Sequence, residues 1–423
     1  MTSILICTVG GSHQPIVTAI KDLRPDFVLF ICTDKDPATG RPGSNQQITG
    51  IGNCIKASNQ DEKPSLPNIP SQAGLKPDQF EVCLTLSDDL DRIYADCCQA
   101  LERLVGRFPD AIIAADYTGG TKSMSAGLIM AAMERQDIQL QLVTGSRADL
   151  IKVHDGSQFT ATANIEKIRF ERLIAPYRQA WGRFAYSEAE AGLKAITAPS
   201  NAQLRGQYTR FRDLSRAFAE WDNFNHQTAV DLLQNYAPSL PQALKVHLPT
   251  VLRLRDNRPE KREAAQLFDL YLNAQRRAAQ GRYDDAVARI YRLIEWTAQW
   301  VLKLQCGIDT SDIKENDIPE AVELTHNRDK RYQAGLFAAW QLIKHKTQGP
   351  AAAFIREEEK TLLNQIKSRN QSILAHGYDP VQQHNWQQLS EWLEAQFIPM
   401  LLAETKQVGI KDLPAQLPRY FEL

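Results

Sequence analysis

The sequence has no excess of charge of either sign. Its 423 residues include 49 Lys and Arg against 50 Asp and Glu, a formal net charge of −1. This balance argues against a broad polycationic surface for duplex nucleic acid, although it permits a compact anion-binding site. Hydrophobic residues make up 43% and charged residues 23%, so the composition excludes disorder and collagen-like structure for most of the chain.

Long apolar runs and a basic amino-terminal leader are also missing. No stretch approaches the ~20 apolar residues that a bilayer-spanning helix needs, and the amino terminus runs directly into a strand-like pattern. We therefore expect no membrane segment and no signal peptide. The seven cysteines are odd in number and lack the spacing and His partners of a zinc knuckle, so we expect reduced thiols, no metal site and a cytoplasmic protein.

Short apolar runs alternate with helical stretches in the first ~160 residues, which predicts an α/β domain with a mostly parallel sheet covered by helices. The expected strands cover residues 3–9, 27–33, 79–86, 111–115 and 138–144, with a short piece at 150–154. Their continuous apolar character is typical of strands buried on both faces. Residues 36–78 are rich in Gly, Pro, Ser and Asn, so we expect a large loop or lid there rather than core.

The strand pattern stops after about residue 164, and the remainder is predicted to be all-α. We divide this part near Arg258, because two strongly periodic helices separated by Gly281 follow that point. The expected domains are 1–160, 161–258 and 259–423, the second being a helical connector. Five arginines in and between the two periodic helices are expected at the surface, where some could line an RNA groove. They are Arg276, Arg277, Arg282, Arg289 and Arg292.

Two glycines, two hydroxyls and a histidine lie at the end of the first expected strand and in the turn after it. They are Thr8, Gly10, Gly11, Ser12 and His13. Paired glycines let a backbone approach a ligand closely, and the Ser12 hydroxyl and the next helix's amides can donate to phosphate. The spacing matches neither GxGxxG nor GxxxxGK[ST], so we reject a nicotinamide enzyme and a P-loop NTPase. For this motif alone, a tight turn without a ligand is an equal alternative.

A second polar cluster follows the expected strand 111–115 and precedes a helix predicted over residues 122–135. It contains Asp116, Thr118, Gly119, Gly120, Thr121, Lys122 and Ser123. Its amides, hydroxyls and positive charge suit an anionic ligand. Two such loops at strand ends of one sheet favour a bound nucleotide or oligonucleotide over a purely structural role. The turn 144–147 is a candidate third wall.

A third motif lies in a helix predicted over residues 357–376 and includes Arg369, Asn370 and His376. A spacing of seven places Arg369 and His376 on one helical face, roughly 10 Å apart along the axis. Metal-free RNA cleavage needs a base, an acid and positive charge at the phosphate, which His and Arg can supply. One pair at this distance does not easily reach a single phosphate, whereas two copies across a dimer axis do. A charged helix face ending in a histidine is the structural alternative.

Together, the three motifs resemble those of the CARF–HEPN ribonucleases, the Csm/Csx-type accessory effectors of type III CRISPR antiviral systems. In that family, a Rossmann-like CARF domain that binds cyclic oligoadenylate has one motif after its first strand and a second, [DN]x[ST]xxx[KR], after its fourth. Asp116, Thr118 and Lys122 fit the second motif. The HEPN domain carries Rx4–6H, which Arg369 and His376 fit with six intervening residues.

The resemblance implies a homodimer whose two CARF domains form one pocket for a cyclic oligoadenylate, a tetra- or hexa-adenylate that acts as allosteric activator, with no cofactor. It also implies one composite site for single-stranded RNA, where cleavage without metal leaves a 2′,3′-cyclic phosphate. His376 would be acid and base, Arg369 would contact the phosphate and the transition-state charge, and Asn370 would orient the site. Two alternatives stay open: a sensor or regulator that cleaves nothing, and a CARF ring nuclease that degrades its own activator.

Overall fold

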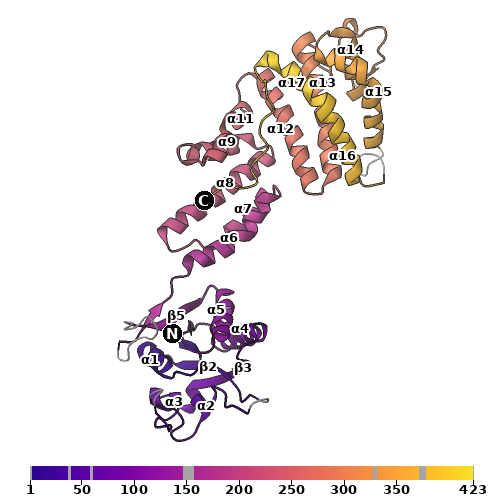
Figure 1. Ribbon diagram of the computed structural model, residues 1–423. Coiled ribbons are helices and arrows are strands. Elements are labelled where there is room, and N and C mark those ends of the chain that lie inside the picture. Colours follow the sequence, from indigo (N-terminus) through magenta and orange to yellow (C-terminus); the bar gives the residue numbers. More distant parts are fainter. Residues whose placement is uncertain are drawn as a thin grey trace. The chain divides into compact units, whose positions relative to one another are not determined.

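The computed structural model describes residues 2–36, 40–57, 61–145, 157–326, 331–370 and 378–422, and for 367–370 it describes the backbone alone. The chain forms two compact units, Met1–Glu171 and Arg172–Leu423. The first contains the sheet and the second is built almost entirely from helices (Figure 1).

Six strands form the sheet of the first unit in the order β3-β2-β1-β4-β5-β6. Their bounds are β1 Ser3–Thr8, β2 Phe27–Thr33, β3 Phe80–Thr85, β4 Ile112–Asp116, β5 Ile138–Thr144 and β6 Phe159–Thr162. All neighbours pair in parallel except β5 and β6, which are antiparallel. The five longer strands confirm the predicted mostly parallel sheet. The short piece expected at 150–154 lies outside the described residues, and β6 was missed because its sequence, FTAT, has no apolar run.

Helices cover both faces of this sheet, because successive residues of each central strand point to opposite sides. In β1, Ile4 and Ile6 lie in the core beneath α4 (Leu90–Arg107) and α5 (Lys122–Met133). Leu5 and Cys7 lie in the second core, beneath α1 (Gln14–Leu23). The expectation of strands buried on both faces is therefore confirmed.

The segment 36–78 contributes to the core, so the prediction that it is only a loop or lid is wrong. It contains α2 (Gln46–Thr49), α3 (Ile69–Ala73) and the 3-10 turn η1 (Pro77–Gln79). Ile48, Ile55 and Ile69 are buried against the α1 side of the sheet. These side chains are isolated among Pro, Gly and polar residues, so the segment shows neither helical nor strand periodicity although its apolar residues are buried.

The second unit is helical, as predicted, apart from the two-residue strands β7 (Thr325–His326) and β8 (Tyr332–Gln333). Its helices are α6 (Glu166–Gly182, beginning in the first unit), α7 (Tyr186–Ala195), α8 (Ala202–Asp222), α9 (His226–Tyr236), α10 (Gln242–Lys245), α11 (Leu248–Arg253), α12 (Pro259–Ala279), α13 (Tyr283–Cys306), α14 (Leu336–Lys346), α15 (Pro350–Asn370), α16 (Gln383–Trp392) and α17 (Ile398–Thr405). Short 3-10 turns lie at Ala237–Ser239, Glu315–Asp317 and Lys406–Val408, and a π-helical turn at Leu393–Phe397 joins α16 to α17. The α12 and α13 pair confirms the two predicted periodic helices, which reverse at Gly281 with a φ of 74°.

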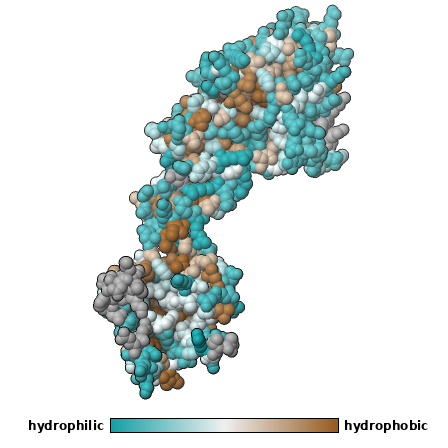
Figure 2. Space-filling model, viewed as in Figure 1, coloured by the Kyte–Doolittle hydropathy of each residue, from teal (hydrophilic) through white to brown (hydrophobic). Residues whose placement is uncertain are grey.

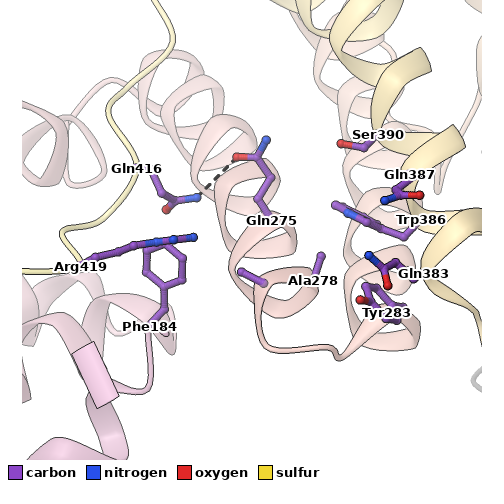
Figure 3. A pocket seen from close by; sticks show the side chains of 11 residues that line it. Phe184, Gln275, Ala278, Tyr283, Gln383, Trp386, Gln387, Ser390, Gln416 and Arg419 are labelled. Atoms are coloured by element: carbon purple, nitrogen blue, oxygen red, sulfur yellow. Dashed lines mark hydrogen bonds between the residues drawn. The ribbon is translucent and has the colours of Figure 1, made fainter. Parts of the chain in front are cut away.

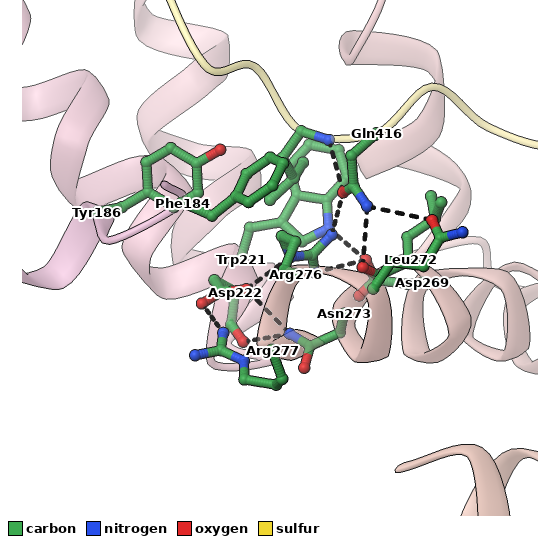
Figure 4. Close-up of polar contacts among 12 residues, drawn as sticks. Phe184, Tyr186, Trp221, Asp222, Asp269, Leu272, Asn273, Arg276, Arg277 and Gln416 are labelled. Carbon is green, nitrogen blue, oxygen red and sulfur yellow. Dashed lines mark hydrogen bonds and ion pairs between the residues drawn. The ribbon is translucent and has the colours of Figure 1, made fainter. Parts of the chain in front are cut away.

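A buried ion-pair network joins α8 to α12 in the second unit (Figure 4). Arg276, whose side chain is 0% exposed, donates from Nε to Asp222 Oδ1 at 2.7 Å, and Arg277 pairs with the other Asp222 oxygen. Asn273 Nδ2 donates to Asp222 Oδ1 at 3.0 Å, and Gln416 accepts from Arg276 Nη1 at 2.7 Å. The expectation that Arg276 and Arg277 lie at the surface is therefore wrong. The sequence around a charged residue in a polar stretch of helix does not reveal the distant partner that allows the residue to be buried.

The network extends to a second buried carboxylate, that of Asp269. It accepts from Trp221 Nε1 at 2.9 Å, lies 2.9 Å from His226 Nε2 and approaches Arg276 Nη2 at 3.6 Å. His226 is thus a buried histidine with a hydrogen-bond partner in the core.

Hydrophilic side chains predominate on the face of the second unit that Figure 2 shows, in keeping with the mixed charges of the sequence. Within the described ranges, no helix is both long enough and apolar enough to cross a membrane.

Candidate functional site

The first two sequence motifs meet at the carboxyl edge of the sheet. The strands that precede them, β1 and β4, are parallel neighbours with Cys7 opposite Asp116. The turns that follow therefore leave the sheet at the same edge, where open α/β sheets bind ligands. Thr8 Oγ1 donates to the carbonyl of Gly119 at 2.7 Å and joins the two turns directly.

Glycines make this contact a close approach of two backbones. A Cβ atom on Gly10 would lie 2.6 Å from the backbone nitrogen of Gly120, and one on Gly119 would lie 2.2 Å from the carbonyl oxygen of Thr8. Gly120 also has a φ of 81°, which side-chain-bearing residues rarely adopt. The paired glycines thus let the two turns form one continuous surface.

Gly10→Ala should destabilise the first unit by about 1–3 kcal/mol, because the new methyl group must displace the Gly120 backbone. Gly11→Ala is the matched control, since a Cβ there meets nothing within 4 Å. Denaturant unfolding of the full-length variants would measure both. Equal stabilities for the two variants would contradict the backbone contact.

Two helices, α1 and α5, start at these turns. The positive ends of their dipoles lie at the carboxyl edge of the sheet without an acidic residue beside them. Neither α1 nor α5 has an acidic residue in its first turn, and the Thr121 hydroxyl caps α5 by accepting from Met124 N at 3.1 Å. Lys122 is exposed at the first position of α5, with no ion pair to any residue that the structure describes. Gly11 and Ser12 are exposed as well. Helix amino-terminal ends, an exposed hydroxyl and an exposed ammonium group suit an anion.

Asp116 and Thr118 hold the second turn in place through hydrogen bonds to the backbone. The Asp116 side chain is 2% exposed, accepts from Thr118 N at 2.8 Å through Oδ1, and has no hydrogen-bond partner at Oδ2 within the described structure. Burial raises the pKa of its carboxyl group. The Thr118 hydroxyl accepts from Val143 N at 2.7 Å, which ties the turn to β5. These contacts position the turn.

Other residues hold the site together without any signal in the sequence. Gln47, on α2 in the segment 36–78, donates to the carbonyl of Gly10. Thr121 donates to the carbonyl of Ser87 in the turn before α4, and the Ser125 hydroxyl lies 2.9 Å from the Gly119 carbonyl. The sequence did not predict a role for Gln47, Ser87 or Ser125. Each of them makes a hydrogen bond that involves a backbone carbonyl, a group that every residue has.

The remaining residues of the first two motifs lie around this edge. His13 is buried at the start of α1 and lines a cavity of about 240 Å³ with Gln14 and Lys21. Ser123 is half-buried in the first turn of α5. Of the candidate third wall, Ser146 and Arg147 lie outside the described residues.

The third motif falls at the carboxyl end of α15. Arg369 and Asn370 are the last two residues of this helix, with backbone alone described, and His376 lies outside the described residues. The chain that follows is anchored at Val381, whose N–H donates to both carboxylate oxygens of Asp284 at 3.1 Å. In the ranges that are described, no group of three or more His, Cys, Asp or Glu side chains could hold a metal ion.

Comparison with known proteins shows which class this architecture belongs to. Residues 172–265 match the family model of the Csm6 6H domain, and residues 255–397 match that of the Csm6 HEPN domain. The solved structure of Enterococcus italicus Csm6 bound to cyclic hexa-2'-fluoro-hexa-dAMP aligns with a TM-score of 0.60 at 14% identity, covering 98% of this chain and 97% of that one. No curated protein sequence matches.

A mostly parallel Rossmann-like domain followed by a helical HEPN region defines the CARF–HEPN class of proteins. Within that class, the chain belongs to the Csm6-type effectors.

Proposed function

We propose that the protein is a cytoplasmic endoribonuclease of type III CRISPR defence, activated by cyclic oligoadenylate and cleaving single-stranded RNA without a metal ion. The observation that carries this proposal is the HEPN match over residues 255–397, because it contains both Arg369 and His376 with the spacing of the HEPN motif. The activator is proposed to bind at the carboxyl edge of the CARF sheet.

The sensor proposal rests on the chemistry of the sheet edge. A cyclic oligoadenylate has phosphates that need positive potential, which the amino-terminal ends of α1 and α5 and the exposed Lys122 supply. Its sugars and bases can form hydrogen bonds with the exposed Ser12 hydroxyl and with the backbone of Gly11. The similar fold of Enterococcus italicus Csm6 holds a cyclic hexanucleotide analogue, which supports the same class of ligand here.

In the effector domain, His376 acts as base toward the ribose 2′-hydroxyl and as acid toward the leaving 5′-oxygen. Arg369 neutralises the charge that develops on the phosphate, and Asn370 orients the site. A homodimer supplies two copies of this set, which meets the requirement that separate groups deliver base and acid to one phosphate. The product is a 2′,3′-cyclic phosphate.

Activation follows from a population shift. The ring, bound across the dimer axis, favours the dimer state in which the two HEPN motifs form one site, and it does so only to the extent that it binds that state more tightly.

Lys122→Ala should raise the activator concentration needed for half-maximal RNA cleavage by about tenfold, because it removes one charge-assisted contact to a phosphate. The maximal rate at saturating activator should stay unchanged. Lys411→Ala, which removes an exposed lysine of the second unit, is the control. An unchanged activation curve for Lys122→Ala would contradict the proposed ring site.

Labelled RNA incubated with the protein, with and without each cyclic oligoadenylate and with and without EDTA, tests the whole proposal. Cleavage that depends on one ring size and resists EDTA is the expected result, and inhibition by EDTA would refute the metal-free mechanism. A protein that cleaves no RNA under any condition would be a sensor or regulator. Loss of the ring in the absence of RNA would identify a ring nuclease, for which Thr118, Thr121 and Lys122 are the candidate residues.

A further inference from the structure

A cavity of about 430 Å³ opens in the second unit, bounded by α12, α13, α16 and the carboxyl-terminal segment (Figure 3). Its lining contains four glutamines, three aromatic side chains and one arginine, and it contains no carboxylate. Its volume is within the range of small-ligand sites. Neither the ring site nor the HEPN motif accounts for this composition.

The α12 side of the cavity is held rigid by its own hydrogen bonds. Gln416 accepts from Arg276 Nη1 at 2.7 Å and donates to the carbonyl of Leu272 at 2.9 Å. Gln275 donates to the Tyr271 hydroxyl at 2.9 Å. Because the buried ion-pair network fixes Gln416, this wall is preformed.

The α16 side presents donors without protein partners. Trp386 is 8% exposed, yet its indole N–H has no acceptor in the ranges that the structure describes. Five other indoles each donate to a protein group, those of Trp181, Trp221, Trp300, Trp340 and Trp392, whereas the half-buried Trp296 packs against Arg292. Gln383 and Gln387 flank Trp386, are exposed, and have side-chain amides without a described partner (Figure 3).

The opposite rim carries a positive charge on an aromatic platform. The guanidinium carbon of Arg419 lies 4.6 Å from the ring centroid of Phe184, and Figure 3 shows the two groups stacked. Arg419 is exposed and pairs with no carboxylate that the structure describes. A guanidinium group held in this way keeps its donors available for a phosphate.

A ligand that binds both the donors on the α16 side and Arg419 on the opposite rim must combine a planar ring, hydrogen-bonding edges and an anionic group. Glutamine amides pair with base edges, aromatic rings stack on bases, and arginine binds phosphate. We propose that this cavity binds an unpaired nucleotide of the RNA substrate, an inference that rests on the proposed ribonuclease function. Duplex RNA cannot enter, because its bases are paired and stacked.

The cavity and the HEPN motif are linked by a short path along the chain and one hydrogen-bonded contact. Tyr283, which lines the cavity, precedes Asp284, the residue that anchors Val381. His376 precedes Val381 by five positions in the sequence, and five positions span at most about 18 Å. A nucleotide held in the cavity would therefore place a neighbouring part of the same strand within reach of the motif.

Binding of a fluorescent, fully 2′-O-methylated single-stranded RNA to the full-length protein tests the proposal without any cleavage. Trp386→Phe, Gln387→Glu and Arg419→Gln should each raise the Kd by about tenfold, the order expected for losing one base or phosphate contact. Arg419→Gln should also reduce the salt dependence of binding, by about one unit in the log–log slope. Gln234→Ala, at an exposed glutamine of α9, is the control.

An unchanged Kd for Gln387→Glu and Trp386→Phe would overturn the proposal, even if Arg419→Gln weakens binding, because charge alone does not make a nucleotide pocket. Gln387 and Arg419 are exposed, so their variants should unfold as the unaltered protein does and decide the question even if Trp386→Phe is unstable. If the variants lose RNA binding as expected but the unaltered protein cleaves no RNA, the nucleotide pocket would be supported and the proposed ribonuclease activity would be refuted.

Discussion

His376→Ala should lower the rate of activated RNA cleavage by about 10²–10⁴-fold, the usual contribution of a general acid or base. Because the proposed composite site needs both copies of the motif, the loss should be the same at every activator concentration. The affinity for cyclic oligoadenylate should not change, since the proposed ring site lies in the other unit. Single-turnover cleavage of labelled RNA and direct binding of the activator would measure the two properties separately.

His345→Ala is the matched control, because His345 is an exposed histidine of α14 outside the motif. It should cleave as fast as the unaltered protein. If His376→Ala kept more than about a tenth of the activity, its loss would be too small for general acid–base catalysis, and the sensor without ribonuclease activity would become the better interpretation.

Asp222→Ala should destabilise the second unit by about 3–5 kcal/mol, because it leaves the buried charges of Arg276 and Arg277 without their shared carboxylate. The carboxylate that remains near Arg276, that of Asp269, lies at 3.6 Å and already accepts from Trp221. Equilibrium unfolding in urea, followed by tryptophan fluorescence, would measure the loss.

A surface ion pair provides the comparison for this prediction. Asp312 pairs with Arg331 at 3.0 Å, and both side chains are more than half exposed, so Asp312→Ala should cost less than about 1 kcal/mol. Similar losses for Asp222→Ala and Asp312→Ala would show that the buried network contributes little to stability.

The type and order of the main elements could be read from the sequence, because each depends on local periodicity. Continuous apolar runs identified β1 to β5, and Gly281 marked the reversal between α12 and α13. The resemblance of three short motifs then led to the CARF–HEPN class, which the comparisons confirm.

Interactions between residues far apart in the chain could not be read in this way. Arg276 looks like any surface arginine until Asp222, 54 positions away, is seen to pair with it in the core. Gln47 likewise supports Gly10 from a segment without periodic pattern. That Trp386 lines a cavity, with no indole acceptor among the described residues, is seen only once its neighbours are placed.

The sequence alone was enough to predict the α/β and helical halves and the class of the chain, and it supplied the motifs at which two small anion sites are proposed. Local propensity and short motifs carry that information. The tertiary structure was needed to show that Thr8 and Gly119 join two motifs 111 positions apart, and that a glutamine-rich cavity borders α16. Burial and hydrogen bonding between distant residues depend on the whole packed chain, so no local pattern records them.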